Sequence, residues 1–138
     1  MPGEPTVREM RVVVTATDYA KAVHFYRDVL GLPELADYSS VDGRVVLLGA
    51  GRATLEIVDP AQAEFIDRVE VGRRVAGHIR VAFEVADSAG MARRLGENGA
   101  TIIADATLTP WQDLNARLEA PGGLQITMFS EATTPPEG

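Results

Sequence analysis

Two arginines occupy matching places in this chain of 138 residues. Arg11 and Arg80 each lie seven residues before an aspartate, Asp18 or Asp87, that can cap the start of a helix. A guanidinium group stays protonated and offers a fork of N–H donors but no lone pair. It can therefore hold a carbonyl, phenolate or carboxylate oxygen of a ligand, whereas it cannot coordinate a metal ion.

Few other residue types in the chain could do chemistry. There is no cysteine and there are only two histidines, which excludes disulfides, thiolate nucleophiles and zinc–thiolate sites. We expect His24 on the surface of a helix, whereas His78 begins a strand, where a structural hydrogen bond and a ligand contact both remain open. The glycines of LGAGRA lie between predicted strands and lack the lysine of a phosphate loop. The only plausible pair of residues for general acid/base catalysis is Glu56 with His78.

The helix after Arg11 is predicted within TDYAKAVHFYRDVLGLPEL, which begins at Thr17. Asp18 can accept from the free N–H groups of the first turn, and apolar residues then recur at helical spacing. Gly31 can adopt the left-handed closing conformation, and Pro33 forbids continuation. Strands are predicted before the helix in RVVVTAT and after it in RVVLLG and RATLEIVD, with a hairpin turn at GAG.

The same order of elements returns downstream. A strand is predicted in HIRVAFEVA, followed by a helix from Asp87 through Leu95 that ENGA closes. Three further strands are predicted in TIIADAT, NARLEA and LQITMFS. The chain therefore contains two copies of one unit, related by a pseudo-twofold axis.

Alignment of the two helix caps places Arg11 opposite Arg80, and alignment of LEI with QIT or its neighbours places Glu56 opposite Thr127.

The length is typical of one domain, and 46% hydrophobic residues suffice for a core. The predicted parts of this domain are module one at about 8–60, a charged linker at about 61–75, module two at about 76–131, and a tail at 132–138 that we expect to fray.

Three segments, AVHFYRDVLGL, GHIRVAFEVAD and LEAPGGLQITMF, resemble recurring segments of the vicinal oxygen chelate superfamily. This superfamily includes glyoxalase I, extradiol dioxygenases, fosfomycin-resistance enzymes and bleomycin-binding proteins. The resemblance covers nearly the whole chain and implies an α+β fold. In that fold two tandem βαβββ modules form curved mixed sheets around a cleft, usually within a homodimer.

The resemblance also points to four strand positions that face the cleft and carry the metal ligands in the metal-using members. The matching residues here are Arg11, Glu56, Arg80 and Thr127, of which only Glu56 is an ordinary ligand. We therefore expect no metal and no cofactor. A register shift of two residues is the alternative, because it would bring His78 into the third position on the same strand face.

The role of these residues has two interpretations. Arg11, Arg80 and Glu56 either form a buried ion network that bridges the modules, or one guanidinium grips a ligand. Trp111 either packs at a strand entrance or stacks on a flat ligand. Tyr38, Phe83 and Met128 are expected in the core. The full set of candidate ligand-binding residues is Arg11, Thr15, Glu56, His78, Arg80, Trp111, Asn115, Arg117 and Thr127.

The formal charge of −7 argues against nucleic acid or an anionic membrane surface as partner. No apolar run is long enough to span a bilayer and the start lacks a signal-peptide pattern, so we expect a cytoplasmic protein. The leading interpretation is a metal-free protein that sequesters a toxic aromatic or polycyclic natural product, as in antibiotic resistance of the bleomycin-binding type. The alternatives are a glyoxalase-like lyase, isomerase or dioxygenase for a small oxygenated substrate, and an interaction subunit whose vestigial cleft would be filled.

Overall fold

A computed structural model describes residues 6–121 and 123–132. Its elements repeat the order strand, helix, three strands, which confirms the two predicted βαβββ modules. The first module contains β1 (Val7–Thr15), α1 (Tyr19–Val23), η1 (His24–Val29), β2 (Glu34–Asp37), β3 (Val45–Ala50) and β4 (Ala53–Val58). After α2 (Pro60–Glu70), the second contains β5 (Ile79–Val85), α3 (Ser88–Glu97), β6 (Thr101–Leu108), β7 (Asp113–Glu119) and β8 (Gln125–Glu131).

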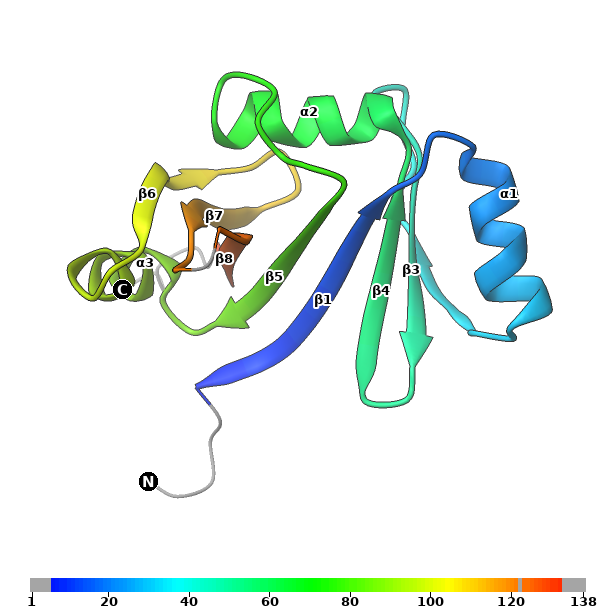
Figure 1. The fold of residues 1–138 in the computed structure, drawn as a ribbon, viewed down its shortest axis with the longest axis horizontal. Helices are drawn as coiled ribbons and strands as arrows, with labels where there is room; N and C mark the ends of the chain where they lie inside the picture. Colours follow the sequence, from blue (N-terminus) through cyan, green and yellow to red (C-terminus); the bar gives the residue numbers. More distant parts are fainter. Residues whose placement is uncertain (1–5, 122, 133–138) are drawn as a thin grey trace, which may run out of the picture.

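All eight strands form one curved sheet in the order β2-β3-β4-β1-β5-β8-β7-β6 (Figure 1). The two modules meet where β1 pairs with β5 in antiparallel orientation. Within each module the first strand pairs in parallel with the last, β1 with β4 and β5 with β8. The mixed sheet and its helices are the α+β fold expected from the sequence.

The strand register confirms the internal equivalence that the sequence predicts. Arg11 pairs with Ala82 across the centre of the sheet, and Val13 pairs with Arg80, so exchanging the modules reproduces the same pairing. Glu56 lies opposite Val13 in the first module, just as Thr127 lies opposite Ala82 in the second. Glu56 and Thr127 are therefore equivalent positions.

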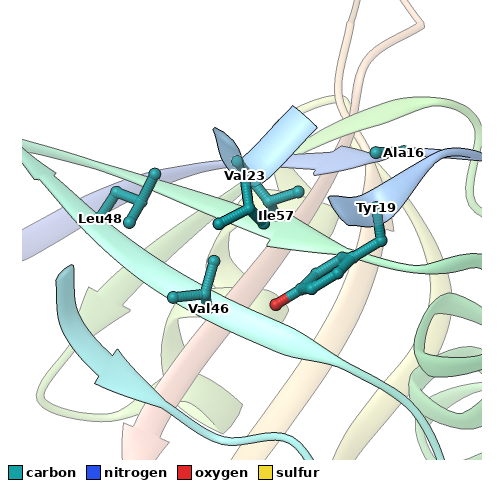
Figure 2. Packing of buried hydrophobic residues seen from close by; sticks show 6 residues of the cluster. All are labelled: Ala16, Tyr19, Val23, Val46, Leu48 and Ile57. Carbon is teal, nitrogen blue, oxygen red and sulfur yellow. The ribbon is translucent and has the colours of Figure 1, made fainter. Parts of the chain in front are cut away.

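Helices α1 and α3 cover the outer face of the sheet, one in each module. The inner face is the one that carries α2. Helix α1 packs its apolar side on β3 and β4, and Figure 2 shows this cluster of Ala16, Tyr19, Val23, Val46, Leu48 and Ile57. Helix α3 packs on the second module over a cluster formed by Val85, Ala92, Ala116, Leu118, Ile126 and Met128. Met128 is thus a core residue as expected, and Phe83 packs against the same cluster.

The predicted helix caps are present in the structure. Asp18 accepts a hydrogen bond from the backbone N–H of Lys21 at 3.1 Å, and Asp87 does the same from Gly90 at 3.0 Å. Gly31 has the predicted positive φ, 89°. The second half of the first helix, η1, is wound as a π-helix, in which Leu30 N–H donates to the Phe25 carbonyl five residues earlier.

The segment expected to be a charged linker forms an ordered helix, α2, over most of its length. Asp59 caps this helix by accepting from Gln62 N–H at 2.8 Å, and Pro60 occupies the first turn, where its missing N–H costs nothing. Its buried residues are Gln62, Ala63, Ile66, Asp67 and Glu70. Because three of these five are polar, the buried stripe does not show as a hydrophobic period in the sequence.

Helix α2 crosses the ends of the central strands on the inner side of the sheet (Figure 1). It is anchored there by an apolar cluster of Val13, Val45, Val58, Ala63 and Ile66.

No helix within residues 6–121 and 123–132 is long and apolar enough to cross a membrane. Of the tail expected to fray, only Ala132 belongs to the described residues.

Candidate functional site

A cavity of about 340 Å3 lies between the inner face of the sheet and α2. Its walls combine charged, amide and aromatic side chains from both modules. The lining residues are Arg11, Tyr38, Val45, Glu56, Gln62, Ile66, Glu70, Arg80, Ala82, Trp111, Asp113, Asn115, Thr127 and Phe129. An open cavity of this size is not the filled cleft that a vestigial interaction subunit would have.

Strand alternation explains why these residues face inward. In β4, Glu56 lines the cavity while its neighbour Ile57 is buried under α1. In β8, Thr127 and Phe129 line the cavity while Met128 is buried under α3. The same period of two brings Arg11 of β1 and Arg80 of β5 to the inner face.

Arg11 is held by carboxylates. Its Nε donates to Glu9 Oε2 at 2.7 Å and its Nη2 to Glu9 Oε1 at 3.2 Å, while its Nη1 lies 3.5 Å from Glu56 Oε1. The guanidinium carbon also lies 5.2 Å from the ring centre of Phe129. Burial alone would lower the pKa of Arg11, but Glu9 outweighs it and the pKa is raised. Most of the binding capacity of this guanidinium is therefore used within the protein.

Arg80 has a different environment. Its side chain is buried, with 7% of the residue exposed, and its Nη1 donates to Thr127 Oγ1 at 3.0 Å. Among the described residues no carboxylate oxygen lies within 4.0 Å of its nitrogens, and none accepts from its Nε or Nη2. Burial lowers the pKa of Arg80, against the attraction of Glu70. Arg80 thus presents a buried cation to the cavity without a bonded counter-ion.

A buried ion network joins α2 to β7, and two of its members, Glu70 and Asn115, also line the cavity. Arg117 is fully buried and donates to Asp67 Oδ1 and to Glu70 Oε1, both at 2.8 Å. Asn115 Nδ2 donates to the second oxygen of Glu70 at 2.7 Å. Gln125 Oε1 accepts from Arg117 Nη1 at 3.1 Å. This network fixes the distance between the helix and the sheet, and so the width of the cavity.

Asp67 is the centre of the network. Its Oδ2 accepts from the backbone N–H groups of Val75 and Ala76 and from Arg74 Nη1, each at 2.8 Å. Burial alone would raise the pKa of Asp67, but these donors and Arg117 outweigh it and hold the pKa below its ordinary value. Asp67 therefore fixes the chain between α2 and β5 while it neutralises Arg117.

Three aromatic residues contribute to the cavity wall. Trp111 is 39% exposed, and its ring centre lies 6.2 Å from that of Phe65 on α2. Phe129 is buried on β8 beside Arg11. Tyr38 was expected in the core but is 57% exposed and lines the cavity, because it follows the end of the short edge strand β2. A flat ligand would find aromatic surface on several sides.

Asp113 is the least compensated carboxylate of the cavity. Its pKa is raised, chiefly by burial; Arg11 opposes the rise, while Glu84 and Glu131 add to it. No described Lys, Arg or His nitrogen lies within 4.0 Å of its carboxylate. Its backbone is fixed, since its N–H donates to Thr109 Oγ1 at 3.1 Å.

The structure brings six of the nine candidate residues to the cavity and leaves three outside. The six are Arg11, Glu56, Arg80, Trp111, Asn115 and Thr127. Thr15 lies at the end of β1, where its N–H donates to the carbonyl of His78 at 3.0 Å. His78 is exposed before β5, so the alternative register that would place it in the cavity is wrong. Arg117 lies behind the wall in the network with Asp67 and Glu70.

Other residues of the cavity were missed by the sequence reasoning. Phe129 and Asp113 could have been found, because they lie two residues from Thr127 and Asn115 and strand alternation places them on the same face. Gln62 and Glu70 lie on α2. They could not have been found while that segment was interpreted as a linker.

The residues at the family's metal positions do not fit a divalent cation. Arg11 and Arg80 supply positive charge instead of lone pairs, and Thr127 is a neutral hydroxyl already used by Arg80. Only Glu56 is an ordinary ligand, and it lies beside Arg11. In the part of the chain that the structure describes, no three His, Asp or Glu side chains come together to hold a metal ion.

Several solved structures share the fold at low sequence identity. A hypothetical protein from Bacillus halodurans C-125 superposes with a TM-score of 0.69 at 15% identity, covering 96% of this chain and 100% of that one. Methylmalonyl-CoA epimerase from Mycobacterium tuberculosis gives 0.67 at 21% identity, with 96% and 94% covered. A glyoxalase/bleomycin resistance protein/dioxygenase superfamily member from Vibrio splendidus 12B01 gives 0.62 at 16% identity, with 91% and 100% covered.

No curated protein sequence gives a significant match. The family model described as Glyoxalase/Bleomycin resistance protein/Dioxygenase superfamily matches residues 10–128, a range that runs from within β1 to within β8 and so covers most of both modules. This match confirms the resemblance seen in the helix and strand segments of the sequence. The chain belongs to the glyoxalase/bleomycin resistance protein/dioxygenase superfamily.

Proposed function

We propose that this protein binds a small, flat, oxygenated aromatic compound in its cavity without a metal ion, and that it protects the cell by sequestering that compound. The observation that carries the proposal is Arg80, a buried guanidinium that faces a cavity with aromatic walls and has no carboxylate within 4.0 Å in the described part of the chain. A buried cation is costly unless an anion or a strong acceptor compensates it. A ligand oxygen would supply that compensation.

The contacts suggest how such a ligand would bind. The free donors of Arg80 would take a phenolate, quinone or carboxylate oxygen through charge-assisted hydrogen bonds. Trp111 and Phe129 would stack on the ring or pack against its edge. Sequestration needs only this complementarity, so it is compatible with the absence of a fitting donor set for a metal ion.

A proton-transfer enzyme is the second candidate, and Glu56 favours it. This carboxylate lines the same cavity as Arg80, so it could take a proton from a carbon next to a ligand carbonyl while Arg80 stabilises the enolate oxygen. Return of that proton from Glu56 to a neighbouring carbon on the same face would complete an isomerisation. One protein of similar fold is a methylmalonyl-CoA epimerase. Dioxygenase chemistry has no comparable support among these residues.

A matched pair of compounds tests the proposal. Calorimetric titration should show 2-hydroxy-1,4-naphthoquinone, which ionises, binding about 10- to 100-fold more tightly than its 2-methoxy analogue, because a hydrogen bond to a charged group contributes about 1.5–3 kcal/mol. Arg80→Gln should abolish the preference. Arg93→Gln, at an exposed position of α3, should keep it.

Two other results would change the conclusion. If neither naphthoquinone nor any compound of a wider aromatic panel binds, sequestration is wrong. If compounds bind but are recovered from the protein chemically altered, and Glu56→Gln stops the alteration while binding persists, the enzyme is the correct reading. Thermal melts of each variant are needed beside the titrations, since a loss of folding would imitate a loss of binding.

A further inference from the structure

The end of the cavity near Asp113 carries an excess of negative charge. Asp113 on β7 pairs across the sheet with Glu131 on β8, and Glu9 on β1 pairs with Glu84 on β5. Like charges that lie directly opposite each other destabilise a sheet. Arg11 attracts Asp113, but its guanidinium is already held by Glu9 and Glu56. The local charge is therefore not balanced within the described part of the chain.

A second charged side chain of the cavity, Arg80, also lacks a close partner of opposite charge in the described part of the chain. Arg80 is buried, and among the described residues no carboxylate lies within 4.0 Å of it. Asp113 and Arg80 line the same cavity but do not pair with each other. Two groups of opposite charge, neither of them in a salt bridge among the described residues, thus face one cavity.

We infer that the natural ligand carries an anionic oxygen at one end and a cationic amine at the other, with an aromatic body between them. This inference rests on the proposed binding function and adds the second charge to it. The amine would lie beside Asp113, where Glu84 and Glu131 increase the attraction. The anionic oxygen would lie beside Arg80 and Thr127.

The strand register sets the length of such a ligand. Arg80 reaches the hydroxyl of Thr127, and Thr127 pairs with Arg117 on β7. Asp113 precedes Arg117 by four residues on the same strand, which corresponds to roughly 13 Å of extended backbone. This backbone separation is of the same order as the span of two linked aromatic rings with a charged substituent at each end, so we choose a biphenyl skeleton for the probes.

Three probes that share one skeleton test the inference. The parent is 4′-(aminomethyl)biphenyl-4-carboxylate, whose methyl ester lacks the anion and whose N-acetyl derivative lacks the cation. Calorimetric titration should show the parent binding at least about 10-fold more tightly than either derivative. Asp113→Asn should remove the advantage over the N-acetyl derivative only, and Arg80→Gln the advantage over the ester only.

The control variant is Asp105→Asn, which removes an exposed carboxylate on β6 and should leave all three affinities unchanged. The inference is overturned if the parent and the N-acetyl derivative bind equally well, or if Asp113→Asn weakens both to the same extent. It is also overturned if none of the three biphenyls binds while 2-hydroxy-1,4-naphthoquinone does, a result that would leave the proposed function standing. If neither scaffold binds, the proposed function fails as well.

Discussion

Arg11 and Arg80 occupy equivalent positions in the two modules, yet only Arg11 lies within 4.0 Å of a carboxylate in the described structure. Strand pairing relates the two residues by the pseudo-twofold axis, so the backbone gives both the same orientation toward the cavity. The side chains around them differ, because Glu56 of the first module corresponds to the neutral Thr127 of the second. The repeat therefore positions two guanidinium groups, and the neighbouring residues assign them different roles.

This difference predicts opposite effects of the same substitution on stability. Arg11→Gln should lower the free energy of unfolding by about 1.5–3 kcal/mol, because Glu9 and Glu56 lose a charged hydrogen-bond partner. Arg80→Gln should leave stability unchanged or increase it, because it removes a buried charge that has no salt-bridge partner among the residues the structure describes. Urea unfolding of the two variants in parallel checks both statements. Equal losses in both would mean that Arg80 is a structural residue after all.

The buried network of Arg117, Asp67 and Glu70 should lose far more stability when its arginine is replaced. Arg117→Met should cost about 3–5 kcal/mol of stability, since it leaves Asp67 and Glu70 buried beside each other without their shared cation. Arg93→Met, which changes an exposed arginine on α3 in the same way, should cost little. Urea unfolding measures the two differences. A small loss for Arg117→Met would show that α2 is not held by this network.

The sequence specified most of the fold because its strands and caps are locally encoded. β-branched runs, Asp18, Asp87 and the glycines after each helix gave the element order, and their spacing gave the internal repeat. Helix α2 could not be read from the same signals. Three of its five buried residues are polar, and the burial of two of them, Asp67 and Glu70, depends on partners on β7 about 45 to 50 residues further along the chain.

Six of the fourteen lining residues were among the candidates from the sequence. The family resemblance implied that Arg11, Glu56, Arg80 and Thr127 face the cleft, and alternation along a strand, a local property, keeps Trp111 and Asn115 on one face. The exposure of Tyr38 and the position of His78 depend on where strands β2 and β5 end. Strand ends are set by tertiary contacts, and the sequence carries little local information about them.

Measuring the metal content of the protein checks directly whether the residues at the four family ligand positions can hold an ion. We expect protein purified without chelator to contain no stoichiometric divalent metal, because two of the four family ligand positions carry guanidinium groups. Chelator should then leave the melting temperature unchanged, since removing a bound ion would lower it by mass action. Elemental analysis and thermal melts with and without chelator measure both. One tightly held zinc, manganese or iron ion per chain would contradict the assignment of Arg11 and Arg80.

The quaternary structure is a separate expectation. We predict a homodimer, because strands β2 and β6 leave two open edges of the sheet and expose apolar side chains such as Leu35 and Leu108. A twofold pairing would cover apolar surface of this kind on both copies at once. Light scattering over a dilution series at micromolar concentrations gives the mass directly. A monomer that persists at the highest concentration would contradict the prediction.

Asp113 should change how the free energy of unfolding depends on pH. Its pKa in the folded protein is raised, mainly by burial and then by Glu84 and Glu131 against Arg11, so the folded state holds this proton more tightly than the unfolded chain. The resulting stabilisation is complete below the unfolded pKa, about 3.9, and is lost as pH rises through the folded pKa. Above the folded pKa, the ionised Asp113 therefore lowers the stability of the protein.

Asp113→Asn should consequently be more stable than the parent protein at pH 7, and the gain should shrink as the pH falls toward about 3.5. Thermal melts of both proteins across this pH range measure the difference in their stability. Acid effects that both proteins share, such as protonation of Asp67, cancel in this difference. Asp105→Asn serves as the control for removal of an exposed carboxylate. If Asp113→Asn is instead the less stable protein at pH 7, the carboxylate makes a stabilising contact, and its free charge cannot be the anchor for a ligand amine.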